Sequence, residues 1–268
     1  MRAIGHIAVN VFKESARDKV LYSIVAFAVI LIGASYLLGQ LTAGQDLKII
    51  KDLGLASIAT FGVLIAVFIG IGLVWKEVER RSIYGLLTKP IRRWEFILGK
   101  YAGLMLTLLV NVSVMTAAFY AVLAYQGWGV DAFARRGWPA PPMDPALLAA
   151  IALIFVELML VTAIALFFST FSSPFLSAVL TLGLWVIGHF NADLRSFENV
   201  LESRTAASLA RGLYYVLPNF AAFDIKAQVV HGQPVAASYV ALSTLYGTAY
   251  LALVLFGAVA VFSRRDFK

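Results

Sequence analysis

The sequence predicts an all-α integral membrane protein, and three observations lead to that fold class. The chain is 61% hydrophobic and 14% charged, whereas soluble domains are about 25% charged. Its apolar runs reach about 20 residues, which suits a transmembrane helix and is twice the length of a barrel strand. The charged residues gather in a few segments between those runs. We therefore expect spanning helices in a single transmembrane domain that covers residues 1–268.

Six apolar runs define the predicted spans. Their approximate bounds are 21–38, 55–74, 101–125, 146–168, 175–190 and 237–262. Before the first span, residues 1–20 combine charges with apolar residues at helical spacing, which predicts an N-terminal interfacial amphipathic helix. Between spans five and six, residues 191–236 form the longest polar segment, and its helical periodicity predicts an outer helical segment.

The basic residues predict which ends of the spans face the cytoplasm. With both termini inside, the inner segments hold 14 Lys and Arg residues and the outer segments hold eight, in agreement with the positive-inside rule. The net charge of +7 therefore belongs to the membrane surface rather than to a nucleic-acid site. We expect a multi-pass protein of the cell (inner or plasma) membrane that contacts membrane lipid and binds no nucleic acid.

The densest charge lies between spans two and three, in residues 75–100, WKEVERRSIYGLLTKPIRRWEFILGK. This segment holds seven of the 22 Lys and Arg residues. Its apolar positions fit a short amphipathic helix, which ends at Pro90 because proline has no amide donor and restricts the preceding residue. On charge alone, the segment is an ordinary cytoplasmic loop.

The residue pattern of this segment resembles that of ABC-2-type transporter permeases. The resemblance rests on the pattern of an acidic pair, Arg80-Arg81, a Leu-Leu pair, Lys89-Pro90, Arg93, Glu95-Phe96 and Gly99-Lys100. Three further stretches extend it over nearly the whole chain: FKESARDKVLY, FFSTFSSPF and YYVLPNFAAFDIKAQVVHG. The second of these also fits a simple Ser-Pro turn. Within the family, the chain resembles the six-span branch related to the nitrous-oxide-reductase (multicopper-enzyme) maturation permease.

The resemblance implies the permease subunit of an ATP-driven ABC-2 exporter. It implies a cytoplasmic coupling helix between spans two and three, two copies of a separate ABC ATPase, and a second permease subunit in a homodimer or heterodimer. The residues expected to contact the ATPase are Glu77, Glu79, Arg80, Arg81, Lys89, Arg92, Arg93 and Glu95.

Catalytic residues are not expected in this chain. Its Gly99-Lys100 pair lacks the glycine five residues earlier and the Ser or Thr that should follow in a P-loop. ATP and Mg would therefore bind to the partner ATPase, and no cofactor is expected here. A metal site is not expected either, because the chain has no cysteine and its three histidines lie on separate segments.

Glu157 is the one acidic residue predicted near the middle of a span. A buried carboxylate needs a partner, a proton or water. Counted from the inner ends, Asn111 and Ser113 of span three lie at a similar depth, so the three residues form a candidate intramembrane polar site. A hydrogen bond between helices would explain it, as would a polar point on a substrate path or a proton site. His189, with Asn191 and Asp193, is expected to be an ordinary interfacial residue.

Two other functions remain open on the sequence. A proton-coupled secondary transporter would use Glu157, although the chain has no evident internal repeat. Alternatively, the permease would transmit force to an extracytoplasmic partner docked on outer loops 126–145 and 191–236. A series of small residues, Gly62, Ala66 and Gly70, predicts close helix packing either within the fold or between two protomers.

Overall fold

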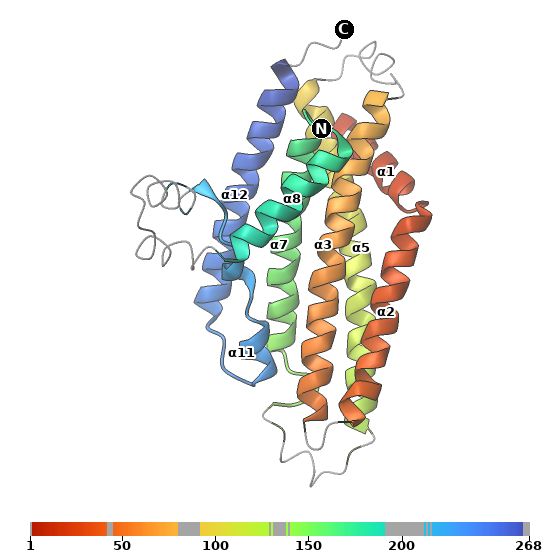
Figure 1. Ribbon diagram of the computed structural model, residues 1–268, viewed down its shortest axis with the longest axis vertical. Helices are drawn as coiled ribbons and strands as arrows, with labels where there is room; N and C mark the ends of the chain where they lie inside the picture. Colours follow the sequence, from red (N-terminus) through yellow and green to blue (C-terminus); the bar gives the residue numbers. More distant parts are fainter. Residues whose placement is uncertain are drawn as a thin grey trace.

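Long helices lie side by side along the long axis of the molecule in the computed structural model (Figure 1). The structure describes residues 2–41, 45–79, 92–128, 130, 138, 140–190, 212, 214 and 216–264, with side chains omitted for 73–79. The elements are α1 (Arg2–Ser15), α2 (Lys19–Gln40), α3 (Asp46–Glu79), α5 (Arg93–Trp128), α7 (Ala146–Ser169), α8 (Pro174–His189), η1 (Phe220–Phe223), α11 (Lys226–Val230) and α12 (Ala237–Arg264). These ranges contain helices and no strand, so the all-α prediction is confirmed.

Five of these helices are long and apolar enough to cross a membrane: α2, α3, α5, α7 and α12. They coincide with five of the six predicted spans. The remaining one, residues 175–190, corresponds to α8, which has only 16 residues. At 1.5 Å per residue it is about 24 Å long, short of the hydrocarbon core of about 30 Å. The chain is thus a multi-pass membrane protein, and the six-span layout stays a prediction.

The start of α1 and the end of α12 lie at one end of the bundle, as Figure 1 shows. The end of α3 and the start of α5 lie at this same end, whereas the end of α2 and the start of α3 lie at the opposite one. In the same view, α8 starts near the first end and runs obliquely to end about half-way along the bundle, on the side of α12. The segments that the sequence assigns to the cytoplasm therefore share one end.

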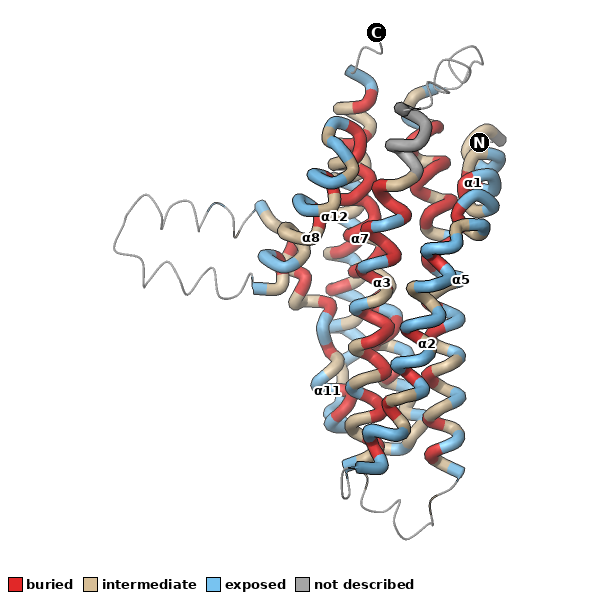
Figure 2. The backbone as a smooth tube through the Cα atoms, turned by 45° about the vertical axis from the view of Figure 1, so that its right-hand side comes forward, coloured by how far each residue is buried: buried red, intermediate tan, exposed pale blue. Residues whose placement is uncertain are grey.

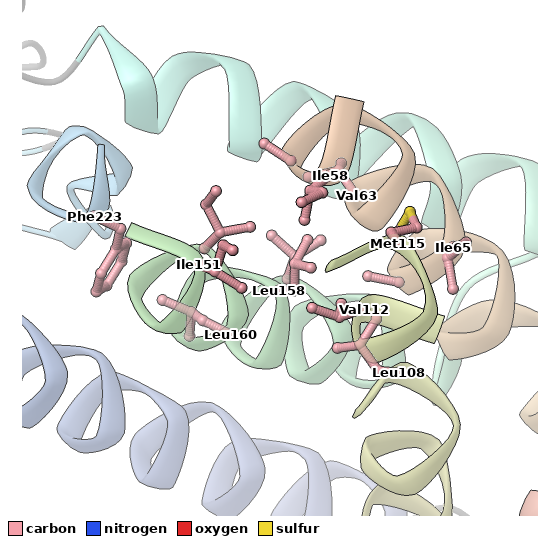
Figure 3. Close-up of a cluster of buried hydrophobic side chains, with 14 of the residues drawn as sticks. Ile58, Val63, Ile65, Leu108, Val112, Met115, Ile151, Leu158, Leu160 and Phe223 are labelled. Atoms are coloured by element: carbon pink, nitrogen blue, oxygen red, sulfur yellow. The ribbon is translucent and has the colours of Figure 1, made fainter. Parts of the chain in front are cut away.

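The core is centred on α3 and α7. In their most apolar windows, 72% and 67% of the residues are buried, against 22% for α2 and 17% for α12, and Figure 2 shows the buried residues along both central helices. Figure 3 shows where side chains from α3, α5 and α7 meet, with Phe223 at one side. This cluster includes Ile58, Val63, Leu108, Val112, Ile151 and Leu158.

Small residues bring α3 close to α7. A Cβ added at Gly62 would lie 2.5 Å from Leu158, and one added at Gly70 would lie 2.7 Å from the Ala165 Cβ. Ala66, between the two glycines, is fully buried. The small-residue series is therefore a packing face within the fold, which resolves the alternative that the sequence left open.

The amphipathic helix α1 packs against the first turns of α5. A Cβ at Gly103 would lie 2.6 Å from the Ala8 carbonyl oxygen and 2.6 Å from the Val11 Cβ. Ala8 and Val11 are both buried. The predicted N-terminal helix is present, and its apolar face is covered by another helix of the same chain.

Substitution of Gly103 by alanine is expected to loosen α1. The methyl group would overlap the backbone of α1, which cannot give way as a flexible side chain can, and such overpacking costs about 1–3 kcal/mol. We expect a lower thermal midpoint in detergent and faster proteolysis between α1 and α2. Gly33→Ala is the control, because nothing lies within 4 Å of a Cβ at that position; an equal drop in both variants would contradict the packing role.

Candidate functional site

The residues predicted to contact the ATPase lie around the junction between α3 and α5. Glu77 and Glu79 belong to the last turns of α3, whereas Arg92, Arg93 and Glu95 lie at the start of α5. Arg80, Arg81 and Lys89 fall outside the described residues, together with the rest of the predicted coupling helix. The structure thus places the two helix ends from which the predicted docking segment would extend.

Arg93 connects the start of α5 to the end of α12. Its Nη1 donates hydrogen bonds to the carbonyl oxygens of Ser263, at 2.7 Å, and Phe262, at 3.3 Å. The last carbonyls of a helix have no partner within that helix and carry partial negative charge, so a guanidinium stabilises them. One turn along α5, the Phe96 ring stacks on that of Phe262, with centroids 5.6 Å apart. The two helix ends are therefore held together by polar and aromatic contacts.

Glu95 caps the helix to which it belongs. The Arg92 backbone N–H donates to Glu95 Oε2 at 3.1 Å. A glutamate at the third helical position that accepts from the N-cap amide is half of a capping box. Arg93 and Glu95 therefore have contacts within the chain that the sequence did not reveal, and their contact with an ATPase stays a prediction.

Lys100 does not belong to the basic surface of residues 75–100 in which the sequence placed it. Its side chain is fully buried, and Nζ lies 4.7 Å from the centroid of the Phe96 ring. Since α1 packs on the same stretch of α5, the surface there is covered. The sequence shows where the charges lie along the chain, but it does not show that α1 covers this part of α5.

Glu157 lies in a polar cluster between α7 and α8. Its side chain is buried, with the residue 4% exposed. The Trp185 Nε1 donates a hydrogen bond of 2.6 Å to Glu157 Oε1, and His189 Nε2 lies 3.6 Å from the same oxygen. Trp185 and His189 are four residues apart on α8, so their side chains lie on one face of the helix.

Two contacts position the His189 ring. His189 Nδ1 lies 3.1 Å from the Trp185 carbonyl oxygen, which can only accept, so this contact is a hydrogen bond when Nδ1 carries the ring hydrogen. His189 Nε2 faces the Glu157 carboxyl group. A carboxyl group and an imidazole that face each other are two groups able to hold a proton.

The described contacts of Glu157 come from α8 rather than from span three. Asn111 Nδ2 donates to the Thr107 carbonyl of its own helix at 2.7 Å, and Ser113 is exposed. A hydrogen bond between helices is therefore present at Glu157, but its donor is Trp185 of α8. The depth count compared spans three and four and did not consider the helix that follows α7.

The structure gives His189 contacts that the sequence did not predict. Its ring stacks on the Phe220 ring, with centroids 5.9 Å apart and an interplanar angle of 11°, while Asn191 and Asp193 lie outside the described residues. The spacing of Trp185 and His189 on one face of an apolar helix is the sequence signal that could have identified a polar cluster.

The segment before α12 closes this cluster. Phe220 and Phe223 of η1 are fully buried, and η1 contacts both α7 and α8. Glycine at 188 permits the approach, because a Cβ there would lie 2.6 Å from the Pro218 carbonyl oxygen. The Asn219 N–H donates to the Tyr246 hydroxyl of α12 at 2.8 Å. In the described part of the predicted outer segment, η1 and α11 are helical, and η1 with its N-cap residue joins α7, α8 and α12.

The carboxyl, indole and imidazole groups of this cluster can link α7 to α8 through polar contacts, and two of them can hold a proton. Within the described part of the chain, no three His, Asp or Glu residues form a group that could hold a metal ion. Near Glu157, Lys226 and Asp224 pair with each other at 3.4 Å.

Comparison with known proteins identifies the family. A family model described as "ABC-2 family transporter protein" matches residues 6–267. The chain belongs to this family. This ABC-2 protein is accordingly a transmembrane permease of the ABC transporter class, and membership implies an ABC ATPase as its partner. No match was found among curated proteins, and the family match does not extend to the nitrous-oxide-reductase maturation branch.

Proposed function

We propose that this ABC-2 protein is the permease subunit of an exporter in the cell inner or plasma membrane, with both termini cytoplasmic. Two copies of a separate ATPase would bind and hydrolyse ATP with Mg, and a second permease subunit would complete the pathway. The chain itself would carry no catalytic residue and no cofactor. The family match over residues 6–267 is the observation that carries the proposal.

The packing of α5 supports a transmission route. The predicted docking segment leads directly into α5, whose first turns contact α1 through Gly103 and α12 through Arg93. A force applied to this segment would move the start of α5 together with both terminal helices, because these contacts join the three. α5 also contacts α2, α3 and α7, so the displacement would enter the rest of the bundle.

Purification of the tagged chain in mild detergent tests the proposal. We expect a P-loop ATPase to copurify in equal amount and to hydrolyse ATP, with a second permease subunit in the same particle. Purification of the chain alone, with full activity driven by a proton gradient, would overturn the proposal.

The Glu157–His189 pair favours a second candidate function, a proton-coupled transporter. A buried carboxyl group that can take up and release a proton is the minimum that such a mechanism needs. A transport assay with a proton gradient and no ATP separates this candidate from the first. A third role, force on an extracytoplasmic partner, would give ATP hydrolysis without movement of a solute.

A further inference from the structure

A pocket of about 380 Å³ is lined by residues from the ends of α2 and α5 and the start of α3. Figure 1 shows these three helix ends at the end of the bundle opposite the start of α5. The main lining residues of the pocket are Tyr36, Gln40, Asp46, Tyr125, Gln126 and Trp128. This volume is within the range of small-molecule sites, which combine apolar walls with a few fixed polar groups. The pocket is separate from the Glu157 cluster and from the helix ends at the predicted docking segment.

A chain of hydrogen bonds fixes the polar side of the pocket. Gln40 Nε2 donates to Gln126 Oε1 at 3.3 Å, and Gln126 Nε2 donates to Asp46 Oδ2 at 3.1 Å. Gln126 is 3% exposed, so its amide is held by partners on both sides. The Asp46 carboxylate is consequently oriented before any ligand arrives.

Aromatic rings form the other side. Tyr36 and Tyr125 meet edge to face, with centroids 5.2 Å apart and an interplanar angle of 70°. Trp128, at the end of α5, is 88% exposed. Aromatic residues often anchor a protein at the membrane interface, but here three of them surround a pocket that also holds a fixed carboxylate.

The electrostatics of the lining select a cation. Among the described residues that line the pocket, Asp46 is the one charged side chain, and its carboxylate favours a cation. Aromatic faces attract cations within about 6 Å of a ring centroid, and aromatic cages recognise quaternary ammonium groups in particular. A neutral sugar would stack on the rings without needing the charge, and a small metal ion would need more oxygen ligands than one carboxylate and neighbouring amides provide.

We propose that this pocket binds an organic ammonium group, with Asp46 as the counter-ion and Tyr36, Tyr125 and Trp128 as the aromatic walls. The group would come either from a choline lipid headgroup or from a small soluble cation. The site is independent of the proposed ATPase partnership, because the chain alone contains every residue named.

Binding of tetramethylammonium and choline to the purified chain tests the site. The chain is placed in nanodiscs of phosphatidylglycerol, which contain no choline, and binding is followed by calorimetry and by saturation-transfer NMR. We expect saturable binding of both cations, weakened at least about tenfold by Asp46→Asn and by Tyr125→Leu. The asparagine removes the charge while its carbonyl oxygen can still accept from Gln126, so the fold is retained.

Asp52→Asn is the matched control, since Asp52 is exposed on the same helix and does not line the pocket. Binding should be unchanged in this variant.

Nanodiscs that contain phosphatidylcholine identify the source of the ammonium group. Weaker binding of the added cations there indicates that a lipid headgroup competes for the pocket, and undiminished binding indicates a soluble cation. Absence of saturable binding, equal losses in both Asp variants, or tighter binding of a neutral sugar would overturn the proposal, whatever ATPase copurifies.

Discussion

Replacement of Arg80 and Arg81 together by glutamate is expected to abolish copurification of the ATPase. Truncating one partner of a buried charge pair at an interface typically costs about 2–5 kcal/mol, and reversal adds repulsion. Two such changes should lower affinity by at least about a hundredfold. The measurement is the ratio of ATPase to permease after affinity purification, together with ATP hydrolysis by the eluate.

A second pair of neighbouring arginines, in another loop of the chain, provides a matched control. Arg135 and Arg136 lie in the predicted outer loop 126–145, so their reversal makes the same change in net charge on the opposite side of the membrane. We expect normal copurification from that variant. Equal loss in both would indicate a general effect of charge on insertion, and unchanged copurification in the Arg80/Arg81 variant would remove the docking prediction.

Arg93 is left out of this variant for a structural reason. Its guanidinium holds the last carbonyls of α12, so reversal would separate two helices as well as alter any docking surface. Arg93→Gln tests that contact by itself. We expect a lower thermal midpoint, since a neutral amide makes a weaker bond to a carbonyl than a charged donor does; an unchanged midpoint would show that the contact contributes little to stability.

The helices could be predicted because each one is indicated by residues within its own segment of the sequence. Runs of about 20 apolar residues have few alternatives in a membrane, and the positions of five spanning helices follow from them. The N-terminal helix was equally readable, because its apolar residues recur at helical spacing. The sequence also placed the basic segment between the second and third runs, which joins the ends of α3 and α5.

The partners of Glu157 could not be predicted, because they depend on geometry that the sequence does not state. A count of depth treats all spans as straight and complete, whereas α8 is short and ends in mid-bundle. Phe220 reaches His189 only because residue 188 is glycine and the chain folds back after α8. The small-residue series had the same limitation: its spacing predicts close packing, but only the fold identifies α7 as the neighbour.

Replacement of Glu157 by leucine is expected to destabilise the bundle, whereas replacement by glutamine should be mild. Leucine leaves the buried Trp185 N–H without an acceptor, and an unsatisfied buried donor costs about 1–3 kcal/mol. Glutamine retains an oxygen at the same place, so the bond to Trp185 survives and only the ability to take up or release a proton is lost. Thermal midpoints of the two variants in detergent measure the difference.

Thr162→Val on the same helix is the control, because the Thr162 hydroxyl donates its hydrogen bond to the Leu158 carbonyl of its own helix. Its midpoint should stay close to that of the unmodified chain, and an equal drop would show that α7 tolerates no change of polarity.

The glutamine variant then decides between the two functions proposed for Glu157, a structural contact and a proton site. Normal transport assigns Glu157 to the joint between α7 and α8. Loss of transport with a normal midpoint and a normal ATPase ratio would instead make proton binding at Glu157 part of the transport cycle, because glutamine keeps the acceptor for Trp185 but cannot take up or release a proton.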